Sequence, residues 1–168
     1  MVRVLFDSNI YGLLVLDDDG LNIIRKILEK EGFIIHDFSL IRKELRDTPQ
    51  NKKLKSYSLR IKLLQIYDRI VKGAVINEDK HMNNLAEDYF KEYQKLGGMV
   101  GRRKIINDFK IVACASIKRM DIIYSEDRHS LKSENAVKAY NIVNFRFNLR
   151  TPNLIDYHTL KKAMNELP

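Results

Sequence analysis

The sequence contains no tryptophan, a single cysteine and no apolar run long enough to cross a bilayer. One cysteine cannot form an internal disulfide, so we expect a protein of a reducing compartment, the cytoplasm. With no membrane span and no signal peptide ahead of the first apolar segment, we expect no membrane partner. Cys114 lies among apolar residues at 111–117, which favours a small buried side chain over a nucleophile.

Negative charge is the scarcer sign in this chain. Lysine and arginine number 30 against 22 aspartates and glutamates, which gives a net charge of +8. A basic excess favours attraction to polyanions, and nucleic acid is the simplest of these. The tyrosines and phenylalanines follow no regular spacing, so no base-stacking platform is predicted. The length of 168 residues suits one domain, residues 1–168, with a core that needs no disulfide or structural metal.

Short apolar segments alternate with longer amphipathic ones, which is typical of an α/β fold with a mainly parallel sheet of about five strands. The predicted strands are residues 2–6, 33–36, 74–76, 122–125 and 141–145. Helical periodicity covers residues 21–30, 58–71 and 83–96, and a further helix-like stretch opens at Asp108. A last helix is predicted from Pro152, with Thr151 as its cap. The polar segment 46–56 and the glycine-rich basic segment 97–104 are predicted to be irregular.

Four acidic residues lie where strands give way to helices. Asp7 ends the first apolar strand, and Asp127 follows the fourth. Glu44 lies about one turn into the helix after the second strand, and Asp108 would belong to the first turn of the helix that feeds the fourth. Ligands of open parallel sheets bind at the carboxyl ends of the strands, so these acids can meet there. Clustered carboxylates repel one another unless a divalent cation neutralises them.

Each acid also has an ordinary structural explanation. Asp108 could be a favourable acid at a helix N-terminus, Glu44 a solvated helix residue, and Asp127 the cap of a turn. Asp7 is harder to explain in this way, because an acid at the end of a buried strand needs a partner or a role. Taken together, the four acids in this order favour a metal site.

The ordered motifs resemble those of the PIN-domain family. They are FDSN at 6–9, Ser39 five residues before Glu44, DFKIVACA at 108–115 and YSEDRH at 124–129. That family contains metal-dependent ribonucleases, among them the toxins of VapBC toxin–antitoxin pairs and RNA-processing nucleases. The resemblance implies a three-layer α/β/α fold with the first strand central. It also implies that Asp7, Glu44, Asp108 and Asp127 are catalytic and bind Mg²⁺ or Mn²⁺.

The resemblance extends to polar residues beside the acids. Asn9 and Ser125 match positions that orient the metal-binding carboxylates. Ser39 matches a position at the start of the helix carrying Glu44, where helix capping is an alternative explanation. His129 stands where many relatives carry a further acid.

The resemblance implies hydrolysis of RNA phosphodiester bonds, with products that carry 5′-phosphate and 3′-hydroxyl ends. Basic residues near the acids would bind flanking phosphates. The candidates are Arg102, Arg103, Lys104, Lys52 and Lys53, with Lys55 beside the last two. The resemblance also allows an antitoxin protein and a second copy of the chain as partners. The alternatives are an RNA-binding module on the same scaffold without catalysis, and a flap-type DNA nuclease.

Overall fold

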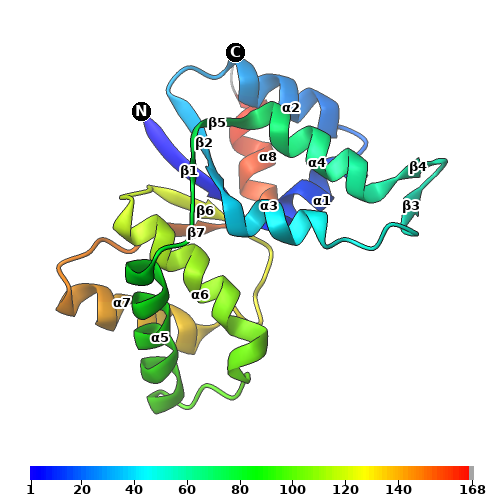
Figure 1. Ribbon diagram of the computed structural model, residues 1–168. Helices are drawn as coiled ribbons and strands as arrows, with labels where there is room; N and C mark the ends of the chain where they lie inside the picture. Colours follow the sequence, from blue (N-terminus) through cyan, green and yellow to red (C-terminus); the bar gives the residue numbers. More distant parts are fainter. Residues whose placement is uncertain (167–168) are drawn as a thin grey trace.

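The computed structural model describes residues 1–166 and contains a five-stranded sheet in the order β5-β2-β1-β6-β7 (Figure 1). Its strands are β1 Val2–Phe6, β2 Phe33–Phe38, β5 Val71–Ile76, β6 Ile122–Tyr124 and β7 Asn153–Ile155. All four pairings between neighbouring strands are parallel. The fold class predicted from the sequence is therefore confirmed, with the first strand at the centre.

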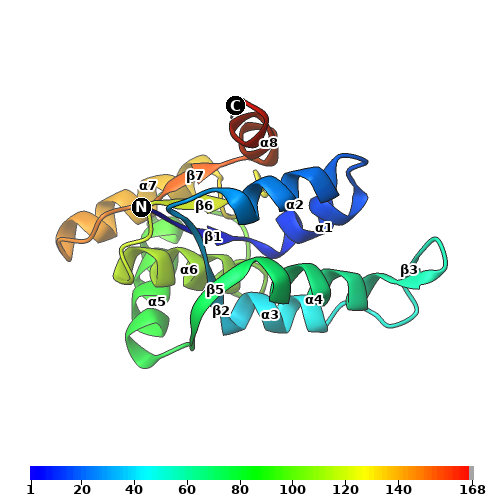
Figure 2. The same cartoon turned by 90° about the horizontal axis from the view of Figure 1, so that it is seen from above.

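Helices cover both faces of this sheet, as the two views agree (Figures 1 and 2). On one side lie α5 Lys80–Lys95, α6 Arg102–Ile117 and α7 Glu134–Arg146. On the other side lie α1 Ser8–Leu16, α2 Gly20–Glu29, α4 Leu59–Ile70 and α8 Tyr157–Asn165. Helix α3 Ser39–Arg46 continues directly from β2, and the hairpin β3 Lys53–Leu54 and β4 Tyr57–Ser58 projects from the body. None of the helices within residues 1–166 is both long and apolar enough to cross a membrane.

The centre of the sheet is apolar because β1 is covered on both faces. Val4, Leu5 and Phe6 are completely buried. Helix α6 is buried along most of its length, and the small side chains of residues 113–115 let it pack closely against its neighbours. Cys114 is one of them, so the buried position predicted for it is confirmed.

Aromatic side chains hold α5, α6 and α7 together on one side of the sheet. The ring of Phe109 on α6 meets that of Tyr140 on α7 edge to face, with 5.4 Å between centroids. Tyr89 on α5 meets Tyr140 at 5.0 Å in the same manner, and its hydroxyl donates a hydrogen bond of 2.5 Å to Oδ1 of Asn144. This cluster fixes α5, α6 and α7 relative to one another.

The C-terminal third differs from the sequence prediction. Residues 141–145 were expected to form a strand but lie in α7, where Ala136, Ala139, Tyr140 and Val143 form the buried stripe of a helix. The fifth strand is instead β7, where the last helix was expected. That helix, α8, begins five residues after Pro152, and Asp156 caps it by accepting the backbone N–H of Thr159 at 2.8 Å.

Helix α6 begins earlier than predicted. It starts at Arg102, after Gly101 as the N-cap residue, and not at Asp108. Its first turn is therefore made by basic residues that were expected in an irregular connection. Asp108 lies in the second turn, so its explanation as an acid at a helix N-terminus is wrong. The helices predicted at 21–30, 58–71 and 83–96 are confirmed as α2, α4 and α5.

Candidate active site

Asp7 is the buried centre of the candidate site. The register that pairs Phe6 with Tyr124 puts Asp7 beside Ser125, at the carboxyl ends of β1 and β6. Its Oδ1 accepts the backbone N–H of Ser8 at 2.7 Å, which caps α1. Its Oδ2 accepts the Asn9 amide at 2.6 Å and the Ser125 hydroxyl at 2.7 Å. Burial raises the pKa of Asp7 despite these hydrogen bonds, and the charge of Asp127 raises it further.

Asn9 and Ser125 connect α1 to the loop after β6. The Asn9 amide nitrogen lies 3.2 Å from Oγ of Ser125, and Oδ1 of Asn9 accepts the backbone N–H of Glu126 at 3.1 Å. Oγ of Ser125 also accepts the backbone N–H of Asp127 at 3.0 Å. Both residues therefore contact the Asp7 carboxylate directly and fix the start of the loop that carries Asp127.

Asp108 and Asp127 lie on either side of the hydroxyl of Ser130. Oγ of Ser130 is 2.5 Å from Oδ2 of Asp108 and also bonds Oδ2 of Asp127. Oδ1 of Asp127 accepts the backbone N–H groups of His129 at 2.9 Å and of Ser130 at 2.8 Å. These bonds are those of a turn cap. The structural explanation of Asp127 as a turn cap therefore holds, and the residue also lies beside Asp108.

The two carboxyls have opposite pKa shifts. Burial raises the pKa of Asp108 to about 7, although the Ser130 hydroxyl opposes this, and the charges of Asp7, Asp127 and Glu44 add to it. Burial also acts to raise the pKa of Asp127, but the hydroxyl and backbone N–H of Ser130 outweigh it, and the pKa is lowered. The ionised form of Asp108 is therefore disfavoured, first by burial and then by its negative neighbours.

Glu44 reaches the same environment from α3. It is half-buried, and its Oε1 accepts the side-chain amide of Asn107, on α6, at 3.2 Å. Burial raises the pKa of Glu44, and the charge of Asp7 adds to that effect. Glu44 is thus not a freely solvated helix residue. The helix itself has Phe38 as its N-cap and no side-chain cap, so the capping explanation for Ser39 is wrong.

The donor chemistry of these four carboxylates suits a hard divalent cation, since carboxylate oxygens are the ligands that Mg²⁺ and Mn²⁺ prefer. Their packing does not form a closed cage. Among residues 1–166, no group of three or more Asp, Glu, His or Cys side chains is placed to hold an ion. The hydroxyl of Ser130 instead joins the carboxylates of Asp108 and Asp127, while Ser125 bonds Asp7 and Asn107 bonds Glu44. The residues thus fit a metal site by their donor chemistry.

Sequence reasoning missed Ser130 and Asn107. Ser130 follows Asp127 at the spacing of a turn, and Asn107 directly precedes Asp108, but neither spacing identifies a partner. Glu126 points elsewhere, because its Oε1 accepts the backbone N–H of Tyr157, at the start of α8, at 2.6 Å. His129 contributes its backbone N–H to the site.

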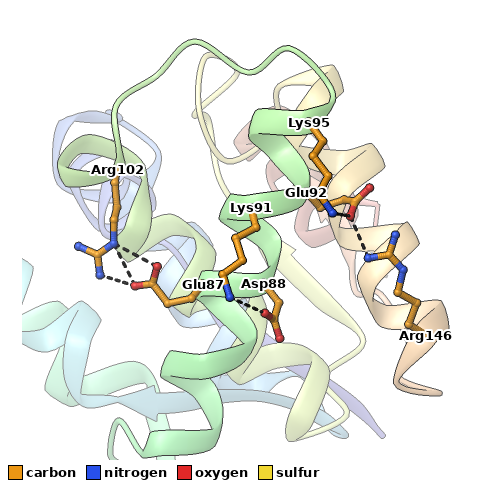
Figure 3. A network of polar contacts seen from close by, with 7 residues as sticks. All are labelled: Glu87, Asp88, Lys91, Glu92, Lys95, Arg102 and Arg146. Carbon is orange, nitrogen blue, oxygen red and sulfur yellow. Dashed lines mark hydrogen bonds and ion pairs between the residues drawn. The ribbon is translucent and has the colours of Figure 1, made fainter.

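The five predicted phosphate-binding residues fall into two groups. Lys52 and Lys53 are exposed at the start of the β3–β4 hairpin, where Lys53 is the first residue of β3. Arg102, Arg103 and Lys104 are exposed in the first turn of α6. Arg102 is engaged by Glu87 of α5, with Nε 3.0 Å from Oε1, as Figure 3 shows. Arg103 and Lys104 thus offer the more available charge in the group next to Asp108.

A separate groove of about 530 Å³, with apolar and charged side chains in its lining, lies between α1, α2, α4 and the hairpin. Its lining includes Leu16, Leu21 and Tyr57, whose side chains are 62%, 77% and 60% exposed. Lys55 and Lys62 contribute positive charge to the same groove, and Asp17 and Asp18 contribute negative charge. Its lining includes none of the four carboxylates, so it is a surface distinct from the candidate active site.

No family model and no curated protein matches this sequence. Among solved structures, the chain is similar to one in the crystal structure of VapBC2 from Rickettsia felis bound to a DNA fragment from their promoter. The TM-score is 0.59 at 15% sequence identity, and the alignment covers 93% of this chain and 99% of that one. At this identity the likeness concerns the fold, and it agrees with the PIN-like α/β/α architecture expected from the sequence motifs.

Proposed function

We propose that the protein is a divalent-metal-dependent endoribonuclease whose metal-binding carboxylates are Asp7, Glu44, Asp108 and Asp127. The observation that carries this proposal is the contact network of the acids: Ser130 bonds both Asp108 and Asp127, and Asn107, the neighbour of Asp108, bonds Glu44. Burial, with the charges of the other three acids in addition, raises the pKa of Asp108 to about 7, which supports the same assignment. Four separate segments supply these side chains at one end of the central strands. A divalent cation relieves the repulsion that such a cluster creates.

The proposed roles follow from the hydrogen bonds. Asn9 and Ser125 hold Asp7, while Asn107 holds Glu44, so each carboxylate is oriented by a neighbouring polar group. Bound Mg²⁺ or Mn²⁺ would supply an acidified water molecule and a polarised phosphate. The products would carry 5′-phosphate and 3′-hydroxyl ends, because the attacking water would add to phosphorus and the 3′ oxygen would be the leaving group.

RNA would approach along the exposed basic residues. Arg103 and Lys104 lie about one helical turn before Asp108 on α6, which suits contacts to phosphates next to the scissile bond. Lys52 and Lys53, at the start of the hairpin, would bind phosphates further along the RNA strand. These contacts recognise the backbone, so they favour RNA binding without setting the cleaved sequence.

A protein partner is part of the proposal. One structural neighbour comes from a crystal structure of VapBC2, and a small antitoxin-type protein would be the corresponding partner here. The groove with Leu16, Leu21 and Tyr57 on its rim supports this, because exposed apolar side chains of this size are typical of an interaction surface. A product of an adjacent reading frame that co-purifies with the chain would identify it. A second copy of the chain is the other candidate occupant, and it would be detected as a dimer in solution.

Cleavage of end-labelled single-stranded RNA by the purified protein, with Mn²⁺ or Mg²⁺ added, tests the proposed activity. EDTA and Asp108→Asn should each abolish cleavage, whereas Asp68→Asn, which changes an exposed carboxylate on α4, should not. RNA binding without cleavage would favour the alternative of an RNA-binding module that has this scaffold but no catalytic activity. Cleavage confined to branched DNA would favour a flap-type nuclease.

A further inference from the structure

Ser130 is a buried serine whose hydroxyl contacts two of the four carboxylates at once. It is 8% exposed, and it follows Asp127 in the turn that leads to α7. Its Oγ lies 2.5 Å from Oδ2 of Asp108 and bonds Oδ2 of Asp127 as well. No other described hydrogen bond within residues 1–166 links these two acids through a single side chain. Ser130 therefore sets how Asp108 and Asp127 lie relative to each other.

One hydroxyl cannot satisfy both carboxylates as well as a cation would. A serine hydroxyl carries one proton, so it can donate to only one carboxylate oxygen at a time. A divalent cation between the same oxygens would neutralise both acids. The hydroxyl is thus the weaker of two groups that can bridge this pair.

The acceptor positions of Asp127 are largely taken in this arrangement. A carboxylate has about four acceptor sites. The backbone N–H groups of His129 and Ser130 occupy Oδ1, and the Ser130 hydroxyl occupies part of Oδ2. The backbone bonds belong to the turn and persist whatever side chain stands at position 130. The hydroxyl is therefore the group that must give way if Oδ2 is to bind a cation.

We propose that Ser130 is a positioning residue whose hydroxyl competes with the divalent cation for the facing oxygens of Asp108 and Asp127. This inference rests on the proposed function, since it assumes that these carboxylates bind the metal. In the ion-free protein the hydroxyl stabilises the pair and keeps it ordered. On cation binding the hydroxyl leaves the shared oxygens. The ion-free fold thus gains stability at the expense of metal affinity.

Two variants and one control separate competition from a purely structural role. Ser130→Ala removes the hydroxyl. Ser133→Ala removes a nearby hydroxyl that bonds the carbonyl of Ser130 at 3.0 Å and touches neither acid. Ser130→Cys keeps a side chain of similar size with a weak donor, and Mn²⁺ favours oxygen over thiol ligands, so it serves if the alanine variant does not fold.

The readouts are Mn²⁺ affinity, from the electron paramagnetic resonance signal of free Mn²⁺, and thermal unfolding in EDTA. Loss of the competing hydroxyl should tighten Mn²⁺ binding by about tenfold, the factor equivalent to one modest hydrogen bond to a charged group. The same variants should unfold at a lower temperature in EDTA. Ser133→Ala should leave Mn²⁺ affinity unchanged.

A structural role alone predicts that stability and Mn²⁺ affinity fall together. Unchanged or weaker Mn²⁺ binding in the position-130 variants would therefore overturn the inference, while leaving the proposed nuclease intact if the wild-type protein binds Mn²⁺ and cleaves RNA. Wild-type protein that binds no Mn²⁺ would overturn both.

Discussion

Replacing Asp108 by asparagine should make the metal-free protein more stable while removing its activity. Burial and the charges of Asp7, Asp127 and Glu44 raise the pKa of Asp108 to about 7 from its ordinary value of 3.8. A carboxyl whose folded pKa is raised destabilises the fold when it is ionised. That destabilisation grows as the pH rises from about 4 to about 7 and is complete above that window.

The size of the effect follows from the same pKa. The difference between the two values corresponds to about 4 kcal/mol if the unfolded carboxyl has its ordinary pKa. Relaxation and water around a half-buried group reduce it, so we expect Asp108→Asn to raise the free energy of unfolding by about 2 kcal/mol at pH 8. For a domain of this size, that is about 4–8 °C in Tm. At pH 4 wild type and variant should differ little.

Thermal unfolding in EDTA at pH 4 and pH 8 measures this effect. Asp68→Asn is the matched control, because its carboxylate is 54% exposed and pairs with Arg42 on the surface, and it should change Tm little at either pH. Added Mg²⁺ should raise the Tm of the wild type more than that of Asp108→Asn, since a bound ion stabilises only a protein that retains its ligands. An Asp108→Asn protein no more stable than the wild type at pH 8 would refute the claim that burial and neighbouring charges destabilise the ionised Asp108.

Further predictions concern the polar network, the packing and the basic residues. Ser125→Ala removes the hydroxyl bond to the buried carboxylate at the end of β1 and should weaken Mn²⁺ binding by about 10- to 100-fold in a metal titration. Tyr89→Phe leaves Asn144 without its 2.5 Å donor and should lower the free energy of unfolding by about 1–3 kcal/mol in urea without changing cleavage. The double variant Arg103→Ala and Lys104→Ala should raise KM for RNA and make the dependence of KM on salt concentration shallower. The slope should fall by the equivalent of about one phosphate contact for each residue replaced. An unchanged salt slope would exclude both residues from the RNA path.

Most of the fold could be predicted because its central strands are easily recognised in the sequence. Residues 2–6 and 122–124 are short apolar runs, and a strand buried on both faces needs no alternation to be recognised. Residues 141–145 misled the prediction because an apolar segment this short fits a strand or a helix equally well. The helical stripe that decides the matter starts earlier, at Ala136.

The edge strand β7 could not be recognised for a related reason. It has three residues, all at least partly exposed, and follows Pro152, which the sequence prediction placed in the first turn of a helix. What makes it a strand is its parallel pairing with β6, a long-range contact that no local pattern records. The start of α6 could not be recognised either, because the basic residues after the glycine-rich segment show no helical periodicity.

The expectation that the four acids lie near the carboxyl ends of the strands came from their order in the chain. The polar groups that bond these acids could not be predicted in this way. Asp7 stood out because a charged residue at the end of a buried strand needs an explanation. Ser130 did not, because its two carboxylate contacts depend on how a turn after β6 folds back against α6. Hydrogen bonds of this kind are set by tertiary packing and are invisible in sequence spacing.

The central claim is that this carboxylate cluster hydrolyses RNA with a divalent cation, and the chemistry of the product ends tests it most directly. RNA treated with the wild-type protein and Mn²⁺ would be analysed for its newly formed termini, with EDTA in a parallel reaction. The account predicts 5′-phosphate and 3′-hydroxyl ends and no cleavage in EDTA. Products with 2′,3′-cyclic phosphate ends, or cleavage that persists in EDTA, would contradict it.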